Sequence, residues 1–220
     1  EVIANGNNGE LRSDNVERGG IMASLFGAED QMLSQTRALD QAARARAAAK
    51  GKKTFVVAEQ YQPQTVEFSG YPSGTIVIDT GAKFLYLVQG DGSARRYGVG
   101  VGKEGFIWKG SEKITRKAEW PSWRPPAEML ERKPELPELM TGGIRNPLGA
   151  KALYLGNTLY RIHGTNDTKS IGYAASSGCF RMMNGHVVHL AGIAGIGTTV
   201  HVLNKLPSNI AKAAKNGGDG

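Results

Sequence analysis

The sequence predicts a mainly β protein whose framework is an antiparallel sheet or β-sandwich. Runs of β-branched and aromatic residues recur between residues 65 and 101, and short Gly-rich turns separate them. Helical patterns of crossover length do not alternate with these runs, which disfavours a parallel α/β fold. The 30 glycines of the chain agree with a framework of many tight turns.

The composition along the chain predicts three parts. Residues 1–60 open with a polar, turn-rich arm and continue with helix formers at 28–50, where Gly51 suits a C-terminal cap. Residues 61–204 carry the β pattern, and residues 205–220, rich in Lys, Gly and Ser, are typical of a flexible tail. We therefore expect one mainly β domain with short helices, an N-terminal helical extension and a loose C-terminus.

Local patterns place the elements of the β domain. Gly156-Asn157 separates two apolar runs and predicts a two-residue hairpin turn. Asn184 is expected to cap a short helix that ends near Ala191. The expected strands are 65–68, 75–79, 83–88, 94–101, 152–155, 158–163 and 198–203.

Residues 120–150 interrupt the β pattern with a proline-rich segment. Trp123 stands between Pro121 and the pair Pro125-Pro126, and Pro134, Pro137 and Pro147 follow. Such a segment forms neither a continuous helix nor a central strand. We expect a lid or binding loop in which Trp123 lines a substrate groove, the alternative being an irregular surface excursion.

The formal net charge of +7 favours acidic partners, such as anionic cell-wall polymers. Nucleic acid is disfavoured, because the 27 lysines and arginines are spread along the chain and no helix-turn-helix, zinc-finger or RNA-binding motif is present. No run of about 18 apolar residues predicts a transmembrane segment. The chain opens on Glu1 without a signal-peptide pattern, so we expect an export signal to be absent or already removed.

Cys179 is the single cysteine of the sequence, so it cannot form an internal disulfide. It lies in Ser176-Ser177-Gly178-Cys179-Phe180-Arg181, downstream of His163-Gly164-Thr165. A buried small hydrophobe and a catalytic nucleophile are both consistent with the residue type alone. Alternation along the preceding strand places Arg161 and His163 on one face, at the strand end, where a site residue is held rigidly.

The pairing of Cys179 with His163 would supply the chemistry of a cysteine nucleophile. A free thiol, with a pKa near about 8.5, is mostly protonated at neutral pH, and its thiolate is the reactive form. A neighbouring histidine takes the proton and later protonates a leaving amine, provided that a third group fixes its tautomer. Gly178 allows a tight turn whose backbone N–H groups would form an oxyanion hole near the sulfur.

A metal site is the alternative use of the histidines. His186 and His189 lie three positions apart on the predicted helix and could join His163 or Cys179 around a metal ion. No further ligand cluster accompanies them, and zinc on Cys179 would block the nucleophile. We therefore expect neither a metal nor a cofactor.

The segments around His163 and Cys179 resemble the active-site signature of the L,D-transpeptidases, the YkuD-type catalytic domain. The family pattern is His-Gly followed downstream by Ser-His-Gly-Cys, a hydrophobic residue, Arg and Met. Here His163-Gly164 is followed by Ser176-Ser177-Gly178-Cys179-Phe180-Arg181-Met182. The resemblance spans about residues 72–204 and includes, in the expected order, Pro-Ser-Gly-Thr-Ile-Val-Ile-Asp at 72–79, Phe-Leu-Tyr at 84–86, Gly-Val-Gly at 98–100, Trp-Arg-Pro-Pro at 123–126 and Asn-Pro-Leu-Gly-Ala at 146–150.

The resemblance implies a β-sandwich-like catalytic domain, exported to the periplasm or cell envelope, that takes part in cell-wall organisation and cell shape. It implies acyl transfer on peptidoglycan stem peptides. The enzyme would cleave a tetrapeptide stem after its third residue, usually meso-diaminopimelate, and release the terminal D-Ala. The acyl group would pass to an amine, giving 3→3 cross-links or attaching a D-amino acid or an outer-membrane protein. Acylation of the cysteine by carbapenems is implied as well.

Matching positions carry the implied roles. The resemblance implies that Cys179 is the nucleophile, that His163 is its base, and that the Gly164 carbonyl orients the imidazole. Backbone N–H groups of Ser177, Gly178 and Cys179 are the implied oxyanion hole. The expected substrate contacts are Ser176, Thr165, Trp123 and Arg181. Arg181 corresponds to the family arginine that braces the site or meets a substrate carboxylate.

Ser177 departs from the family pattern, since many members have a second histidine there. That position is not the base, so we expect activity with altered substrate contacts. Two other functions stay open: an L,D-carboxypeptidase-type cysteine hydrolase, in which water replaces the amine, and a non-catalytic cell-wall-binding module. The intact Cys179, His163 and Gly178 disfavour the binding module, whereas the hydrolase would use the same residues.

Overall fold

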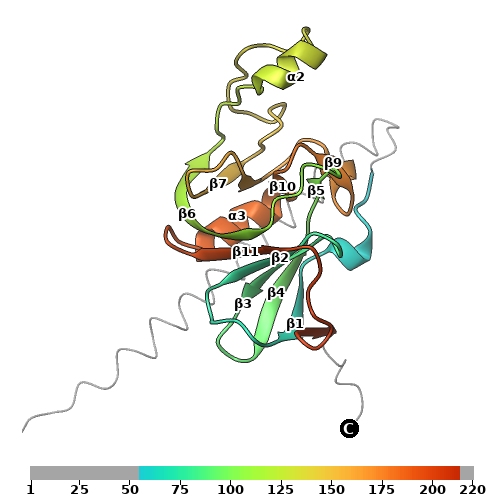
Figure 1. The fold of residues 1–220 in the computed structure, drawn as a ribbon, viewed down its shortest axis with the longest axis vertical. Helices are drawn as coiled ribbons and strands as arrows, with labels where there is room; N and C mark the ends of the chain where they lie inside the picture. The colour runs from blue at the N-terminus through green and yellow to red at the C-terminus, as the bar shows by residue number, and fades with distance from the viewer. Residues whose placement is uncertain (1–54, 214–220) are drawn as a thin grey trace, which may run out of the picture.

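The computed structural model describes residues 55–213, and the predicted N-terminal arm and helix at 1–50 lie outside the described residues. Two short helices stand among many strands (Figure 1). The elements are η1 (Glu59–Tyr61), β1 (Gln64–Phe68), β2 (Ile76–Asp79), β3 (Phe84–Val88), β4 (Ser93–Gly98), β5 (Val101–Gly102), β6 (Gly110–Glu119), α2 (Ala127–Arg132), β7 (Lys151–Leu155), β8 (Arg161–His163), η2 (Thr168–Ser170), β9 (Ala174–Ser176), β10 (Phe180–Arg181), α3 (Asn184–Ile193), β11 (Thr199–Leu203) and β12 (Ala211–Ala213).

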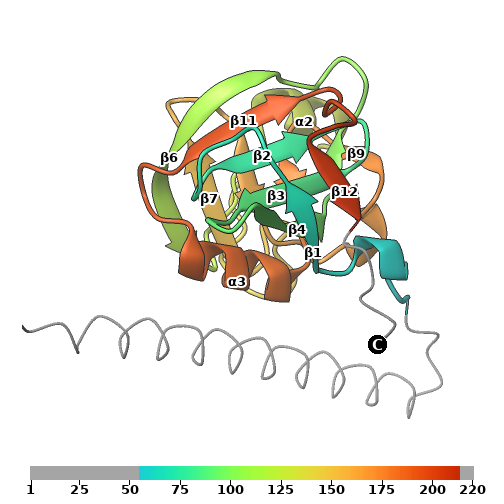
Figure 2. The same ribbon diagram turned by 90° about the horizontal axis from the view of Figure 1, so that it is seen from below.

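Ten of the strands form one curved sheet in the order β10-β8-β7-β6-β11-β2-β3-β4-β1-β12. Seen from below, the sheet curls around the core and α3 lies along one side of it (Figure 2). Most neighbours are antiparallel, but β11 pairs with β2 in parallel and β10 pairs with β8 in parallel. β5 and β9 form a separate parallel pair. The prediction of a mainly β fold is confirmed, with these parallel pairings added to the expected antiparallel ones.

The central strand β2 shows why the sheet forms where it does. All four of its residues are buried, because β2 has strand neighbours on both sides and packed side chains on both faces. Ile76 and Ile78 face the larger core cluster, to which α3 contributes Val187 and Leu190. Val77 faces a second cluster on the opposite side of the sheet. The apolar β-branched run at this position therefore serves two cores at once.

The second core cluster corrects the prediction of a flexible tail from residue 205. Residues 211–213 form β12, which pairs with β1. Leu206 is buried in the second cluster, and its N–H donates to Asp79 Oδ2 over 2.9 Å. The tail prediction is wrong for residues 205–213, because these residues cover apolar side chains and pair with a strand that would otherwise be the sheet edge.

The proline-rich segment between β6 and β7 protrudes from the sheet and carries α2 at its far end (Figure 1). Trp123 and Met140 join its two arms through reciprocal backbone hydrogen bonds of 2.8 Å. Asn146 holds its base: the side-chain amide donates to the carbonyls of Pro121, Met140 and Thr141 over 3.0–3.1 Å. The segment is thus an ordered excursion with a closed neck.

Candidate active site

The parallel pair β8–β10 brings the predicted nucleophile and base to one face of the sheet. Phe180 lies opposite Ile162, and Arg181 lies opposite His163. Phe180 and Ile162 are both buried in the larger core cluster. Because side chains alternate along a strand, Arg161, His163, Cys179 and Arg181 therefore point to the other face. The polar and reactive side chains thus lie on one face of this strand pair, and the hydrophobic core lies on the other.

A tight turn presents Cys179 at the start of β10. Ser176 Oγ donates to the Cys179 carbonyl over 2.6 Å and accepts the Gly178 N–H over 3.2 Å, so one hydroxyl holds both sides of the turn. Gly178 has a φ of 111°, which side-chain-bearing residues rarely adopt. A Cβ at this position would also lie 2.6 Å from Tyr160 Cε1. Both the backbone conformation and the close packing of Tyr160 require glycine before the cysteine.

The same turn changes the predicted oxyanion hole. The Gly178 N–H is used by Ser176 Oγ, so it is not free for a substrate oxygen. The N–H groups of Ser177 and Cys179 make no hydrogen bond to any residue in the described part of the chain. Of the three N–H groups that we expected as donors, those of Ser177 and Cys179 are therefore available, whereas the Gly178 N–H stabilises the turn.

His163 is buried at the end of β8, with 4% of its surface exposed. Its Nδ1 lies 2.5 Å from the carbonyl oxygen of Gly164. Because a carbonyl only accepts, Nδ1 carries the proton and Nε2 is left as an acceptor. This is the tautomer that a base for a thiol requires.

Close packing fixes the carbonyl that orients the imidazole. The Gly164 N–H donates to Lys151 on β7 over 2.9 Å. Asn184 Oδ1 accepts the Ala150 N–H over 2.9 Å and would collide with a Cβ at Gly164. Asn184 therefore does not cap α3 as predicted; Met183 is the N-cap residue, and Asn184 instead joins the helix to the loop before β7.

Burial sets the protonation states of the pair. Desolvation lowers the pKa of His163 to about 3; hydrogen bonds to the backbone of Gly164 and Leu148 oppose this shift, and the charges of Arg181 and Arg161 add to it. Desolvation raises the pKa of the Cys179 thiol, against the opposing charges of Arg161 and Arg181 and a hydrogen bond from the Arg161 backbone. At neutral pH the resting site thus holds a thiol and a neutral imidazole. The thiol donates to the Leu159 carbonyl over 3.7 Å.

The strand register places the thiol and the imidazole near each other. Cys179 immediately precedes the pair Phe180–Ile162, so it is a diagonal neighbour of His163 across the two strands. Diagonal neighbours on one face of a sheet lie about 7–8 Å apart, within reach of long side chains.

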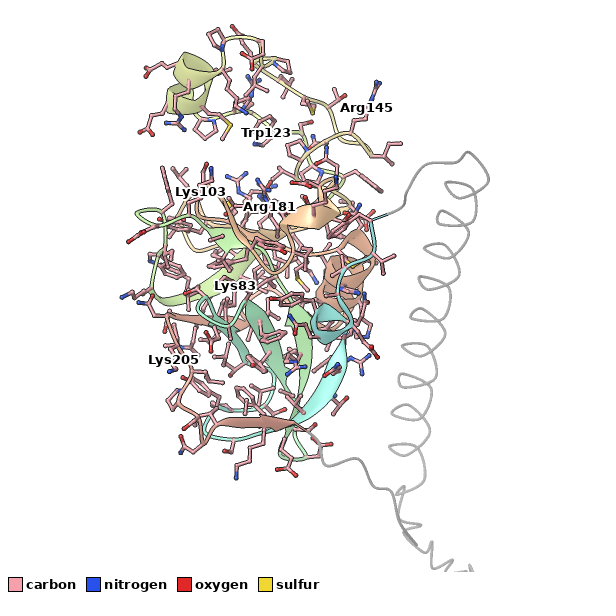
Figure 3. All side chains as sticks on the ribbon, turned by 90° about the vertical axis from the view of Figure 1, so that its right-hand side faces the viewer. Lys83, Lys103, Trp123, Arg145, Arg181 and Lys205 are labelled. Atoms are coloured by element: carbon pink, nitrogen blue, oxygen red, sulfur yellow. The ribbon has the colours of Figure 1, made fainter. Side chains whose placement is uncertain are left out.

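The other predicted site residues divide into two groups. Thr165 and Ser176 are buried and shape turns; Thr165 Oγ1 accepts the Asp167 N–H over 3.0 Å. Arg181 is partly exposed on the site face, with one nitrogen 3.8 Å from Asp167 Oδ2. Figure 3 shows Trp123 in the protruding segment, with Arg181 on the part of the body that faces this segment. The structure therefore leaves Arg181 and Trp123 in position to meet a ligand and gives Thr165 and Ser176 structural contacts.

The histidine pair on α3 lies outside this site. His189 Nδ1 is 2.7 Å from the buried Tyr97 hydroxyl, and His186 is buried beside the same ring. Within residues 55–213, no group of three or more potential ligands is placed to hold a metal ion. The helices in that range include none that is long and apolar enough to cross a membrane.

An apolar wall beside Cys179 was not predicted from the sequence. The rings of Trp108 and Tyr160 stack with centroids 5.4 Å apart, and Tyr160 packs against Gly178. Leu159 and Phe106 expose apolar surface, Leu159 to the extent of 79%. Trp108 and Phe106 lie far from Cys179 in the sequence, so only the fold reveals that the Phe106 backbone and the Trp108–Tyr160 stack lie near the Gly178 turn.

A cysteine on a rigid turn, a histidine of fixed tautomer on the adjacent strand and free backbone donors define a cysteine-dependent acyl-transfer enzyme. Comparison with known proteins gives the family. The family model of the YkuD L,D-transpeptidase catalytic domain matches residues 73–202. The chain belongs to this family.

Two curated relatives are named as L,D-transpeptidases, and one solved structure under another name is similar in sequence. The putative L,D-transpeptidase in the ATP synthase subunits region of Fuscovulum blasticum is 34% identical over 131 residues, covering 58% of this chain and 68% of the relative. The probable L,D-transpeptidase ErfK/SrfK of Salmonella typhimurium is 30% identical over 161 residues, covering 69% of this chain and half of the relative. A Brucella melitensis crystal structure, named as a probable carnitine operon oxidoreductase, is 46% identical, with 67% of this chain and 96% of that chain covered and a TM-score of 0.46.

Proposed function

We propose that this chain is an L,D-transpeptidase that acts on peptidoglycan stem peptides in the cell envelope. One observation carries the proposal: Cys179 and His163 share one face of the β8–β10 pair, and the Gly164 carbonyl leaves Nε2 of the imidazole as an acceptor. Membership of the YkuD family supports the reaction class and the peptidoglycan substrate. The net charge of +7 suits an anionic wall polymer.

The first half-reaction is acylation. Nε2 of His163 takes the proton of Cys179, and the thiolate attacks the carbonyl carbon of the third residue of a tetrapeptide stem. The N–H groups of Cys179 and Ser177 stabilise the oxyanion of the tetrahedral intermediate. The C–N bond then breaks, His163 returns its proton to the departing amine, and D-Ala leaves as the thioester forms.

The second half-reaction is transfer. The amine of an acceptor attacks the thioester carbonyl and gives its proton to His163. The C–S bond then breaks, and His163 passes that proton to the departing sulfur, which restores the thiol and the neutral imidazole. A side-chain amine of a second stem as acceptor yields a 3→3 cross-link. A free D-amino acid or an amine of an outer-membrane protein would complete the same step with different products.

The protruding segment suits the role of a substrate lid. It is tied at its neck and base, and Trp123 and Arg181 lie on the facing sides of segment and body (Figure 3). A substrate between them would be shielded from water, which favours transfer to an amine over hydrolysis.

Mass spectrometry of the products tests the proposal. The purified protein is incubated with disaccharide-tetrapeptide, beside a Cys179→Ala variant. A cross-linked dimer with loss of D-Ala, absent from the variant, is the expected result. Release of D-Ala with only monomeric tripeptide would instead identify a hydrolase, and the absence of any Cys179-dependent product would overturn the assignment.

Carbapenem acylation provides a second, substrate-independent check. Incubation with a carbapenem should add one drug mass to the intact wild-type protein and none to Cys179→Ala. An unmodified wild-type protein would contradict the role of Cys179 as an accessible nucleophile.

A further inference from the structure

Arg161 is a cation on the same sheet face as the proposed nucleophile. It is the first residue of β8 and lies opposite Tyr154 of β7, on the same face as His163. Its guanidinium carbon lies 5.3 Å from the centroid of the Tyr154 ring. Arg116 of β6 lies 3.6 Å from the centroid of the same ring. The cation–π contact limits the motion of Arg161 without neutralising its charge.

Arg161 has no counter-ion within residues 55–213. The ion pairs in this range are Lys151–Glu119 and Arg181–Asp167. Its Nε is buried and has no hydrogen-bond partner there. A buried donor without a partner is costly, so such groups usually have a ligand or an ordered water in the working protein. Arg161 thus differs from Arg181, whose charge is partly balanced by Asp167.

We propose that Arg161 binds the C-terminal carboxylate of the donor stem and makes the enzyme specific for donors that end in a free acid. The proposal rests on the proposed function, because it concerns the substrate of that reaction. Cys179 lies beside Arg161 across the β8–β10 pair, one position before the Phe180–Ile162 pair. In the donor, the carboxylate of the leaving D-Ala belongs to the residue directly after the scissile carbonyl. Arg161 lies across the strand pair from the attacking residue and on the same face, so we assign the carboxylate to its guanidinium.

A guanidinium suits this task better than a neutral donor would. It offers several N–H groups in a planar array that matches a carboxylate, and hydrogen bonds between charged groups are the stronger ones. Arg161 also influences the pKa of both Cys179 and His163, so its charge reaches the reacting atoms. The experiment must therefore separate recognition of a carboxylate from a general effect on the catalytic pair.

The experiment compares two donors that differ only at the end of the stem. One tetrapeptide ends in D-Ala as the free acid and the other ends in D-alaninamide; kcat/KM for release of the fourth residue is measured for wild type, Arg161→Gln, Arg161→Lys and Arg116→Gln. Arg116→Gln is the matched control, because Arg116 contacts the same tyrosine ring but lies two strands away from β8. A third donor with the free side-chain carboxylate of meso-diaminopimelate amidated tests the other nearby anion.

We expect wild type and Arg116→Gln to prefer the free-acid donor by about 10- to 100-fold, the size of a hydrogen bond between charged groups. Arg161→Gln should lose this preference by slowing only the free-acid donor, and Arg161→Lys should regain part of it. An equal loss for both donors, an unchanged preference in Arg161→Gln, or a preference that follows the diaminopimelate carboxylate would each overturn the proposal.

Failure of the proposed function would be visible separately. If wild type releases the fourth residue from neither donor, the transpeptidase assignment fails. Arg161 is then tested by calorimetric binding of both tetrapeptides to Cys179→Ala and to Cys179→Ala/Arg161→Gln. Selective loss of free-acid affinity in the double variant would support the carboxylate site, and equal affinities in the two proteins would refute it.

Discussion

Replacement of His163 by glutamine should remove a large part of the pH dependence of stability. Glutamine is neutral at every pH and keeps an N–H that can donate toward the Gly164 carbonyl. His163 is buried, and desolvation lowers its pKa to about 3 in the folded protein, against 6.5 for the free side chain. As the pH falls below 6.5, the unfolded chain therefore binds a proton that the folded chain does not.

The two pKa values give the size of the effect. Since the unfolded state binds more protons between pH 6.5 and 3, the free energy of unfolding falls as the pH falls through this window. Between pH 7 and pH 5, His163 alone should lower it by about 2 kcal/mol. His186, whose pKa burial lowers to about 4, should contribute a similar loss over the same interval.

Urea denaturation at pH 7 and pH 5, followed by tryptophan fluorescence, measures both contributions. Wild type should lose about 4 kcal/mol between the two pH values, and His163→Gln and His186→Gln should each lose about 2 kcal/mol. The double variant should be nearly flat in this range. The same loss in His163→Gln as in wild type would refute a buried neutral imidazole at position 163, and with it the assigned tautomer.

Three further predictions concern the turn and the protruding segment. Because burial raises the pKa of the Cys179 thiol, its rate of alkylation by iodoacetamide, measured by mass spectrometry, should still be rising above pH 8.5. A rate that reaches a plateau near neutral pH would contradict a resting thiol. Gly178→Ala should lower the free energy of unfolding by about 1–3 kcal/mol, because of its φ of 111° and the collision with Tyr160. Because Tyr160→Ala also loses the stacking on Trp108, the collision is measured as a difference: Gly178→Ala should cost less stability in a Tyr160→Ala background than in wild type, as thermal denaturation would report. Asn146→Ala removes the amide donor from three carbonyls, of which only that of Met140 keeps another donor within residues 55–213, the Trp123 N–H. It should lower the free energy of unfolding by about 1–3 kcal/mol, whereas an unchanged denaturation midpoint would show that the amide does not hold the segment.

The strands that sequence predicts are those whose residues are buried. The runs at 75–79 and 83–88 are apolar because β2 and β3 lie in the centre of the sheet, so composition alone locates them. β6 was not predicted from the sequence because Ile114 is its single buried residue, and its remaining positions carry no alternating apolar pattern. β12 was not predicted either, because its partner, β1, lies far away in the sequence.

The proposed catalytic pair gives clearer sequence signals than its surroundings do. A single cysteine after a Gly and a histidine at a strand end are local signals, and the structure places both on one face. The use of the Gly178 N–H by Ser176 depends on a side-chain rotamer, which the sequence does not encode locally. Alternation placed Arg161 beside His163, but its closeness to Cys179 follows from the parallel pairing of β8 with β10.

The two ends of the proline-rich segment are held together where they leave the sheet, so the segment can be exchanged. Glu119 pairs with Lys151, and the Trp120 N–H donates to Ala150 over 2.8 Å, so the chain leaves and re-enters the sheet at one place. Doubling the length of a loop with fixed ends costs only about 0.6 kcal/mol in closure entropy. Residues 122–145 can therefore lengthen, shorten or be exchanged by grafting, while Leu148 and Gly149, which pack beside His163 and Gly164, stay as they are. Mutation or design can therefore change the segment that faces the substrate without changing the strands that carry the reacting residues.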